Sequence, residues 1–245
     1  MRIAASIVGL PLVSLSIMAT SEATEGTVPS ADGVSIHYVV EGSGAPPMVF
    51  VHGWSGDISI WEGQIRHFSK KHQVVAIDMA GHGASGRNRK EWTVPAYGGD
   101  IAAVLDKLDL KGAVLIGHSM GGLVITQAVS LAPQRVALLV PVDSLHDVEQ
   151  KPTPEQVAGF LAPFRADFPK AVAAFIRGFF PEGTDPALVD RVVKKASAAP
   201  PEIAISSLQG IFEFDLAGVM EGIKTPFHAI NSDKYPTRLE VNRRH

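Results

Sequence analysis

The sequence predicts an α/β fold in which a mostly parallel sheet is flanked by helices and interrupted by a helical insertion. Between residues 34 and 142, short apolar runs of strand length alternate with stretches of helical periodicity, and parallel strands need such crossovers. From 144 to 224 only helical patterns follow. We therefore expect a core of residues 24–143 and 225–245, with 144–224 as a separate helical unit.

In the first half of the core, the sequence predicts two strands, a helix and a third strand. Residues 34–40 alternate apolar and polar side chains, and residues 47–51 form an apolar run that ends before His52. Residues 57–71 have helical spacing, and residues 73–79 form a buried strand that ends in glycines. The apolar stripe of the expected helix consists of Trp61, Ile65 and Phe68.

The second half of the core repeats this alternation. Residues 97–108 predict a helix and 113–116 a strand that runs directly into a glycine. Residues 119–131 predict a helix of small and apolar residues, and 136–142 an apolar strand. Repeated strand–helix–strand units predict a parallel sheet that helices cover on both faces.

Four helices are expected in the insertion, at 153–164, 168–180, 186–198 and 201–214, several with proline in the first turn. Most phenylalanines of this segment should pack its own core, and a few should face a cleft. Strand character returns once, at residues 226–230.

Length and composition exclude several classes of protein. A chain of 245 residues with 46% hydrophobic residues can bury a sizeable core, unlike a disordered chain. A formal net charge of -3 gives no basic field for nucleic acid. Without cysteine, the chain has no disulfide, thiolate metal site or cysteine nucleophile. No cluster of ligating residues indicates a metal site.

Residues 1–23 have the pattern of a signal peptide. Arg2 precedes an uncharged apolar run, 3–19, and small residues follow up to Ala23. The run is short for a membrane span of about 20 residues. We expect cleavage and export to the periplasm or the medium, with no stable membrane insertion afterwards. An uncleaved anchor is the alternative.

The segment Gly117-His118-Ser119-Met120-Gly121 matches G-x-S-x-G between a predicted strand and a predicted helix. In that context a sharp turn presents the serine above the sheet edge, at the N-terminus of the helix. The helix dipole there favours negative charge beside the hydroxyl. Ser119 is therefore the expected nucleophile.

A second group, His52-Gly53-Trp54, follows the strand at 47–51. A tetrahedral oxyanion needs two donors, which we expect to be the backbone N–H groups of Met120 and Trp54. His52 is expected to brace the loop and not to act as the base, because it precedes the nucleophile in the chain.

Together with Asp78-x-x-Gly81-His82-Gly83-x-Ser85, these motifs resemble the α/β-hydrolase superfamily over most of the chain. The resemblance implies that residues 144–224 form a cap over the active site. It also implies a serine hydrolase that cleaves a small carboxylic ester or similar acyl substrate without a cofactor. Carbon–carbon bond hydrolysis and cofactor-free perhydrolysis are alternatives on the same scaffold. Dehalogenase and epoxide-hydrolase chemistry would need an aspartate at position 119.

Residues 81–86 also fit G-x-G-x-x-G, the pattern of a dinucleotide site. Such a site continues into an apolar helix, whereas a basic stretch, residues 87–90, follows here. We interpret this stretch as a solvated loop and expect no nucleotide cofactor.

Two aspartates could be the acid of a triad. Asp143 ends the strand at 136–142, and Asp233 follows the strand at 226–230. Asp233 lies earlier than the family pattern implies, so Asp143 is slightly favoured. Either carboxylate could orient an imidazole and stabilise its charged form.

The base is not identified. The resemblance implies a helix, a strand and a histidine loop after the Asp233 region, and residues 234–245 are too few for them. We therefore expect the last strand and helix to be missing, so an inactive fragment or a non-catalytic binding protein is a third hypothesis. His82, His118 and His146 are expected to have structural roles, and His245 to be frayed at the terminus.

Overall fold

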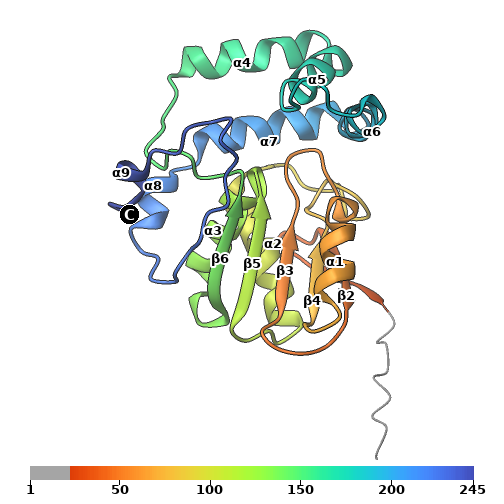
Figure 1. The fold of residues 1–245 in the computed structure, drawn as a ribbon, viewed down its shortest axis with the longest axis vertical. Coiled ribbons are helices and arrows are strands. Elements are labelled where there is room, and N and C mark those ends of the chain that lie inside the picture. Colours follow the sequence, from red (N-terminus) through yellow and green to blue (C-terminus); the bar gives the residue numbers. More distant parts are fainter. Residues whose placement is uncertain (1–22) are drawn as a thin grey trace, which may run out of the picture.

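The structure, a computed structural model, describes residues 23–245. Of the expected signal peptide, residues 1–22 lie outside this range. A sheet of six strands has the order β1-β2-β4-β3-β5-β6 (Figure 1). The strands are β1 (Thr24–Pro29), β2 (Ser35–Glu41), β3 (Met48–Val51), β4 (Val74–Ile77), β5 (Ala113–His118) and β6 (Val136–Val142).

The sheet is mixed, with a parallel centre and an antiparallel margin. Strands β4, β3, β5 and β6 run parallel to one another, whereas β2 pairs antiparallel with both β1 and β4. The prediction of an α/β fold with a mostly parallel sheet is confirmed. Strand β1 was not predicted, because its sequence, TEGTVP, contains glycine and proline and lacks a strand pattern.

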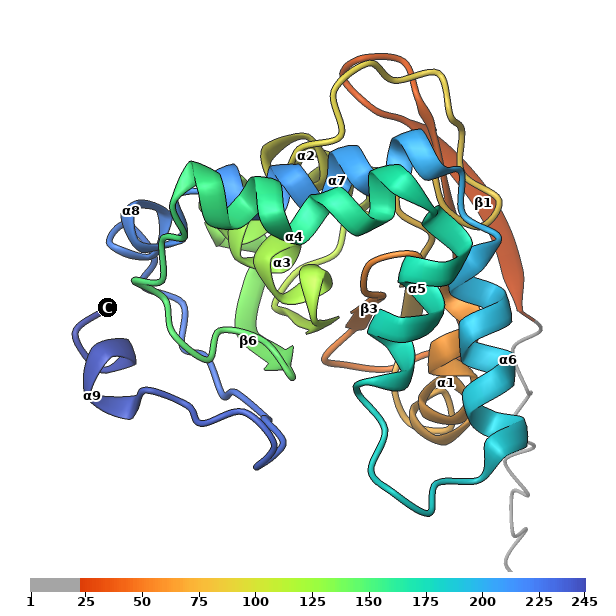
Figure 2. The ribbon, with the colours of Figure 1, turned by 90° about the horizontal axis from the view of Figure 1, so that it is seen from above.

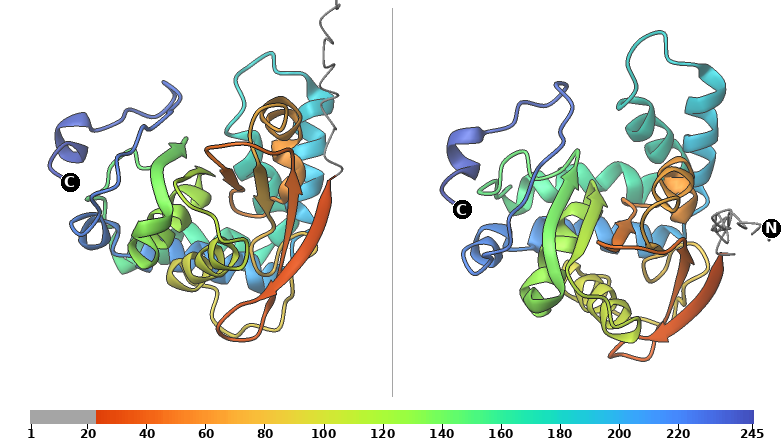
Figure 3. Two further views of the ribbon diagram at one scale, coloured as in Figure 1. Left: turned by 90° about the horizontal axis from the view of Figure 1, so that it is seen from below. Right: turned by 60° about the horizontal axis from the view of Figure 1, so that its bottom comes forward.

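Helices cover both faces of the sheet. Helices α2 (Val94–Lys107) and α3 (Met120–Leu131) pack on one face, and α1 (Glu62–Phe68) lies on the other (Figure 3). The single helix expected at 57–71 is instead a 3-10 turn, η1 (Ile58–Trp61), followed by α1. Asp57 caps η1 by accepting a hydrogen bond from the Ser59 N–H.

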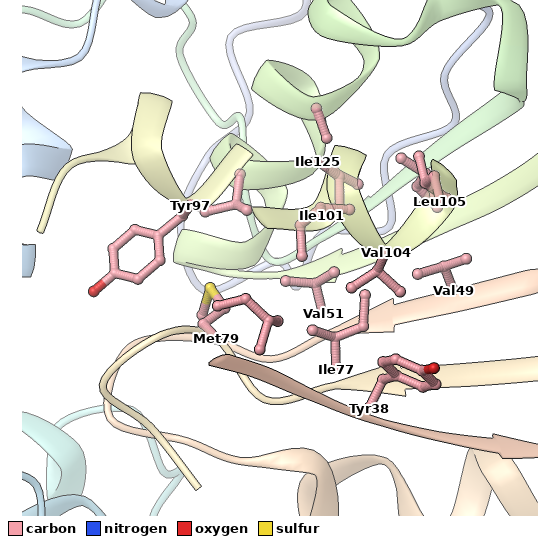
Figure 4. Packing of buried hydrophobic residues seen from close by; sticks show 14 of the residues in the cluster. Tyr38, Val49, Val51, Ile77, Met79, Tyr97, Ile101, Val104, Leu105 and Ile125 are labelled. Carbon is pink, nitrogen blue, oxygen red and sulfur yellow. The ribbon is translucent and has the colours of Figure 1, made fainter. Parts of the chain in front are cut away.

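The main core lies between α2, α3 and the sheet. Its side chains interdigitate at the centre of the sheet, where the parallel strands are apolar on both faces (Figure 4). The buried side chains of α2 that meet this sheet are Tyr97, Ile101, Val104 and Leu105. They face Val49, Val51, Ile77 and Met79.

Within residues 144–224 the structure shows helices and no strand. They are α4 (Pro154–Ala166), α5 (Phe168–Arg177), α6 (Pro186–Ser197), α7 (Pro201–Glu213) and α8 (Leu216–Met220). We call residues 144–224 the cap, because α4 to α7 lie above the carboxyl ends of the central strands (Figures 1 and 2). The cap has an apolar cluster of its own, built around Leu161, Phe164, Val172 and Leu208. No helix within residues 23–245 is long and apolar enough to cross a bilayer.

The strand expected at 226–230 runs beside β6 but forms only isolated bridges, Leu139 with Phe227 and Val142 with Ile230. The N–H groups of Leu139 and Asp143 donate to this segment. Pro141, midway between them, has no N–H to donate, so the ladder is interrupted there. The chain then reaches the short helix α9 (Leu239–Asn242).

The basic stretch at 87–90 is not wholly solvated, which corrects the expectation. The Arg89 side chain is 2% exposed and hydrogen-bonds both oxygens of the fully buried Asp100, at 2.6 and 2.8 Å. It also pairs with Asp32 at 2.7 Å. Asp32 and Asp100 lie 57 and 11 residues from Arg89 in the sequence, so the charges of residues 87–90 alone could not reveal its burial.

Candidate active site

Ser119 occupies a strained turn between β5 and α3. Its φ of 52° and ψ of -119° are rare for a residue with a side chain. The turn fits because Gly121 lies against the end of β3, where a Cβ would come within 2.6 Å of the carbonyl oxygens of Val51 and His52. The hydroxyl of Ser119 is exposed and does not cap α3.

The loop after β3 packs directly against this turn. A Cβ at Gly53 would lie 3.3 Å from the Ser119 Cβ and 2.9 Å from His118 Nδ1. Among residues 23–245, the backbone N–H groups of Trp54 and Met120 have no hydrogen-bond acceptor. The two free donors are therefore the N–H of Met120, which follows Ser119 in the chain, and the N–H of Trp54, in the loop that packs against the Ser119 turn.

His52 holds the base of this loop. Its Nδ1 donates to the Gly53 carbonyl at 2.7 Å, and its Nε2 accepts from the Met79 N–H at 3.0 Å. Burial lowers the pKa of His52 to about 4, so the ring is neutral at pH 7. Because both ring nitrogens are used by backbone groups, neither is free to exchange a proton with Ser119.

His82 is held in the same way behind the loop. Its Nδ1 donates to the Ala80 carbonyl at 2.9 Å, and its Nε2 accepts from the Ser55 N–H at 3.3 Å. Burial lowers the pKa of His82 to about 4, and the nearby His52 adds to this effect. The two rings lie 5.2 Å apart, centroid to centroid.

Asp143 is tied to Ser119 through its neighbours. The Ser119 N–H donates to the Val142 carbonyl at 2.9 Å, and Ser144 Oγ donates to the Ser119 carbonyl at 2.9 Å. The Asp143 carboxylate accepts two bonds of 2.8 Å from Ser232, through its N–H and its hydroxyl. Partial burial raises the pKa of Asp143, but the bonds from Ser232 outweigh it, so the pKa lies below its ordinary value.

The two candidate acids differ in their surroundings. Asp143 is half-buried beside the turn, with His146 Nε2 at 3.8 Å. Asp233 is exposed and forms no hydrogen bond or ion pair within the described part of the chain. The structure therefore places Asp143, and not Asp233, between the two residues that hydrogen-bond the Ser119 backbone. The contribution of Ser144 and Ser232 had no sequence signal, since both are single serines in loops.

The histidines do not complete a triad in this structure. Within residues 23–245, no imidazole forms a hydrogen bond with Ser119 Oγ. His118 is directed toward Gly53, and burial lowers its pKa. His146 lies beside Asp143. His245 is not frayed, which corrects the expectation, because its Nε2 lies 3.1 Å from the Glu149 carboxylate.

Trp54 connects the loop after β3 to the cap. Its indole N–H donates to the Ala204 carbonyl of α7 at 2.8 Å. Its ring meets Phe164, Phe168 and Phe175 edge-on, with centroids 5.7 to 6.4 Å apart. An aromatic wall from the cap therefore stands over the loop that supplies one of the free N–H donors.

Residues 46–211 match the family model described as alpha/beta hydrolase fold. The chain belongs to this family. A non-heme chloroperoxidase from Streptomyces lividans is 40% identical over 129 residues, which are 51% of this chain and 47% of that protein. An acetyltransferase component of the acetoin cleaving system from Cupriavidus necator is 37% identical over 45% of this chain and 30% of its own length. The chain thus spans less than half the length of these relatives.

Solved structures of the alpha/beta hydrolase fold superpose on this chain over most of its length. An enol-lactonase from Burkholderia xenovorans has a TM-score of 0.76 and 22% identity, over 89% of this chain and 85% of its own. An esterase from Exiguobacterium antarcticum has a TM-score of 0.73 and 19% identity, over 89% and 94%. At these identities the likeness shows the shared fold.

Proposed function

We propose that the protein is a serine hydrolase that cleaves a carboxylic ester or a similar small acyl compound through an acyl-enzyme on Ser119. The observation that supports this proposal is the packing of the exposed Ser119 turn against the loop of Trp54, where the backbone N–H groups of Trp54 and Met120 are unpaired. Two such donors beside a nucleophile are what a tetrahedral oxyanion requires.

The reaction has two steps. Ser119 Oγ forms a bond to the carbonyl carbon, and the alcohol leaves with a proton as the ester bond breaks. Water then attacks the acyl carbon, which releases the acid and restores the hydroxyl. The Trp54 and Met120 N–H groups stabilise the oxyanion in both steps. Asp143 is the proposed acid of the site, and its carboxylate could stabilise a charged imidazole.

The cap supplies the apolar part of the substrate site. The wall of Phe164, Phe168 and Phe175 stands over Trp54 and can cover an acyl or alcohol group. Excluding water there strengthens the hydrogen bonds to the oxyanion. No cofactor or metal takes part in this scheme.

Replacement of the nucleophile tests the proposal. Ser119→Ala should abolish turnover of short-chain p-nitrophenyl esters and labelling by a fluorophosphonate, with an unchanged circular dichroism spectrum. Ser130→Ala is a matched control, because Ser130 is an exposed serine near the end of α3. Labelling that persists in Ser119→Ala would show that the reactive group lies elsewhere.

Acyl transfer to hydrogen peroxide is a second candidate. The similarity to a non-heme chloroperoxidase favours it, and the same acyl-enzyme on Ser119 would serve. Replacing water by hydrogen peroxide in the second step gives a peracid. Measuring peracid against carboxylic acid, at fixed ester and increasing peroxide, distinguishes the two acceptors.

We also propose that the protein works outside the cytoplasm after removal of residues 1–23. The support is the apolar run at 3–19, followed by small residues. N-terminal sequencing of protein from the periplasm or medium should start near Thr24. A product that keeps Met1 would contradict export by cleavage.

A further inference from the structure

A cleft of about 470 Å³ lies between α6 of the cap and the loops that follow β3 and β4. Its lining includes none of the groups assigned to the serine chemistry. Four basic side chains from two distant segments line the cleft: Arg87 from the core, and Arg191, Lys194 and Lys195 from α6.

The charges in this cleft are not balanced. Asp57 is the one carboxylate in the lining, and both its oxygens lie 2.7 Å from Lys195 Nζ. Among residues 23–245, no carboxylate pairs with Arg87, Arg191 or Lys194. Three exposed cations therefore line the cleft without a carboxylate partner, on a chain whose formal net charge is -3.

The helix itself explains only part of this arrangement. Lys194 and Lys195 lie in the last turn of α6, where cations complement the helix dipole. Arg191 shares their face, at helical spacings of three and four. Arg87, however, belongs to a core loop that lines the same cleft. Cations that line one cleft repel one another, and an anion bound among them would offset that repulsion.

The floor of the cleft contains a polar group without a partner. Ser55 is 5% exposed and lines the cleft, and its hydroxyl has no hydrogen-bond partner among the described residues. A buried hydroxyl without a partner costs free energy. A ligand with hydrogen-bonding oxygens would supply that partner.

We propose that this cleft binds a small dianion, a phosphate ester or a dicarboxylate, between the cap and the core. Arginine is suited to bidentate contacts with either group. The ligand would bridge Arg87 of the core to Arg191 and Lys194 of α6, and so hold this end of the cap against the loop that carries Trp54. The inference does not depend on the chemistry proposed for Ser119.

Calorimetric titration of the full chain with inorganic phosphate and, separately, with succinate tests the proposal, and acetate serves as a monoanion control. The double variant R191Q/K194Q should weaken binding of the dianion at least about tenfold. The matched control R165Q/K170Q removes the same charge from exposed cap positions outside the cleft and should bind like the wild type. Preference for phosphate or for succinate identifies the kind of dianion.

The unfolding midpoint gives a second measurement, because a ligand that binds the folded state raises it. Ser55→Ala should raise the midpoint without anion, since an unpaired hydroxyl is removed, and should weaken dianion binding several-fold. Equal affinities in the wild type and R191Q/K194Q, or no binding of either dianion at millimolar concentration, would overturn the proposal.

Discussion

Ser144 Oγ donates a 2.9 Å hydrogen bond to the carbonyl oxygen of Ser119. Since the Ser119 N–H donates to Val142, both neighbours of Asp143 are bonded to the backbone of the serine. Gly122 leaves room for this arrangement, because a Cβ there would lie 2.3 Å from Ser144 Oγ. The place of Asp143 relative to Ser119 is thus fixed by hydrogen bonds of Ser119 with the residues on both sides of Asp143.

Asp143 and Asp233 should differ in their effect on stability. Asp143→Asn replaces a carboxylate that accepts two bonds from Ser232, so we expect a loss of about 1 kcal/mol in the free energy of unfolding. Asp233→Asn changes an exposed side chain and should alter it by less than about 0.5 kcal/mol. Urea unfolding measures both changes. Equal effects of the two substitutions would contradict a stabilising role of the Asp143–Ser232 hydrogen bonds.

Ester turnover by the 245-residue chain should be slow. No imidazole among residues 23–245 hydrogen-bonds Ser119 Oγ, and general-base assistance contributes about 10²–10⁴ to such rates. We therefore expect a kcat below about 0.1 s⁻¹ on a p-nitrophenyl ester. His146→Gln and His245→Gln should leave this residual rate unchanged. An ordinary esterase rate that falls in His146→Gln would show that His146 serves as the base.

Stability should fall as the pH is lowered from about 6.5 toward 4. His52 and His82 have pKa values of about 4 in the folded protein, against about 6.5 when unfolded. The unfolded chain therefore binds protons first, at a cost on the order of 3 kcal/mol for each histidine once the pH reaches 4. Urea unfolding at pH 7.5 and pH 5 measures the decline. His67→Gln is a control, because His67 is exposed, and this variant should show the same decline. A free energy of unfolding that does not change between these pH values would contradict the role of His52 and His82.

Arg89 should be among the most sensitive charged positions of the core. Arg89→Ala leaves the fully buried Asp100 carboxylate without its cationic partner, and breaking a buried ion pair costs about 3–5 kcal/mol. Lys90→Ala, at the adjacent exposed position, should change the free energy of unfolding by less than about 0.5 kcal/mol. Thermal and urea unfolding provide the comparison. A small effect of Arg89→Ala would show that water reaches Asp100.

The sequence by itself determined the features that depend on near neighbours in the chain. The G-x-S-x-G segment specifies its turn locally, because a Cβ at Gly117 would lie 2.2 Å from the Gly121 carbonyl oxygen. The strand–helix alternation specifies the parallel centre of the sheet. These features arise from local sterics and from the period of apolar residues, which a sequence shows directly.

Only the tertiary structure decided features whose partners are distant in the chain. Strand β1 forms because it pairs with β2. Pro141 interrupts the pairing between β6 and residues 226–230, which is left with isolated bridges at Leu139 and Val142. Arg89 is buried because Asp32 and Asp100 surround it, although its own neighbours look solvated. The basic cleft likewise needs Arg87 of a core loop and the cations of α6 in one lining. Long-range electrostatics and hydrogen bonding set these features, and no local pattern records them.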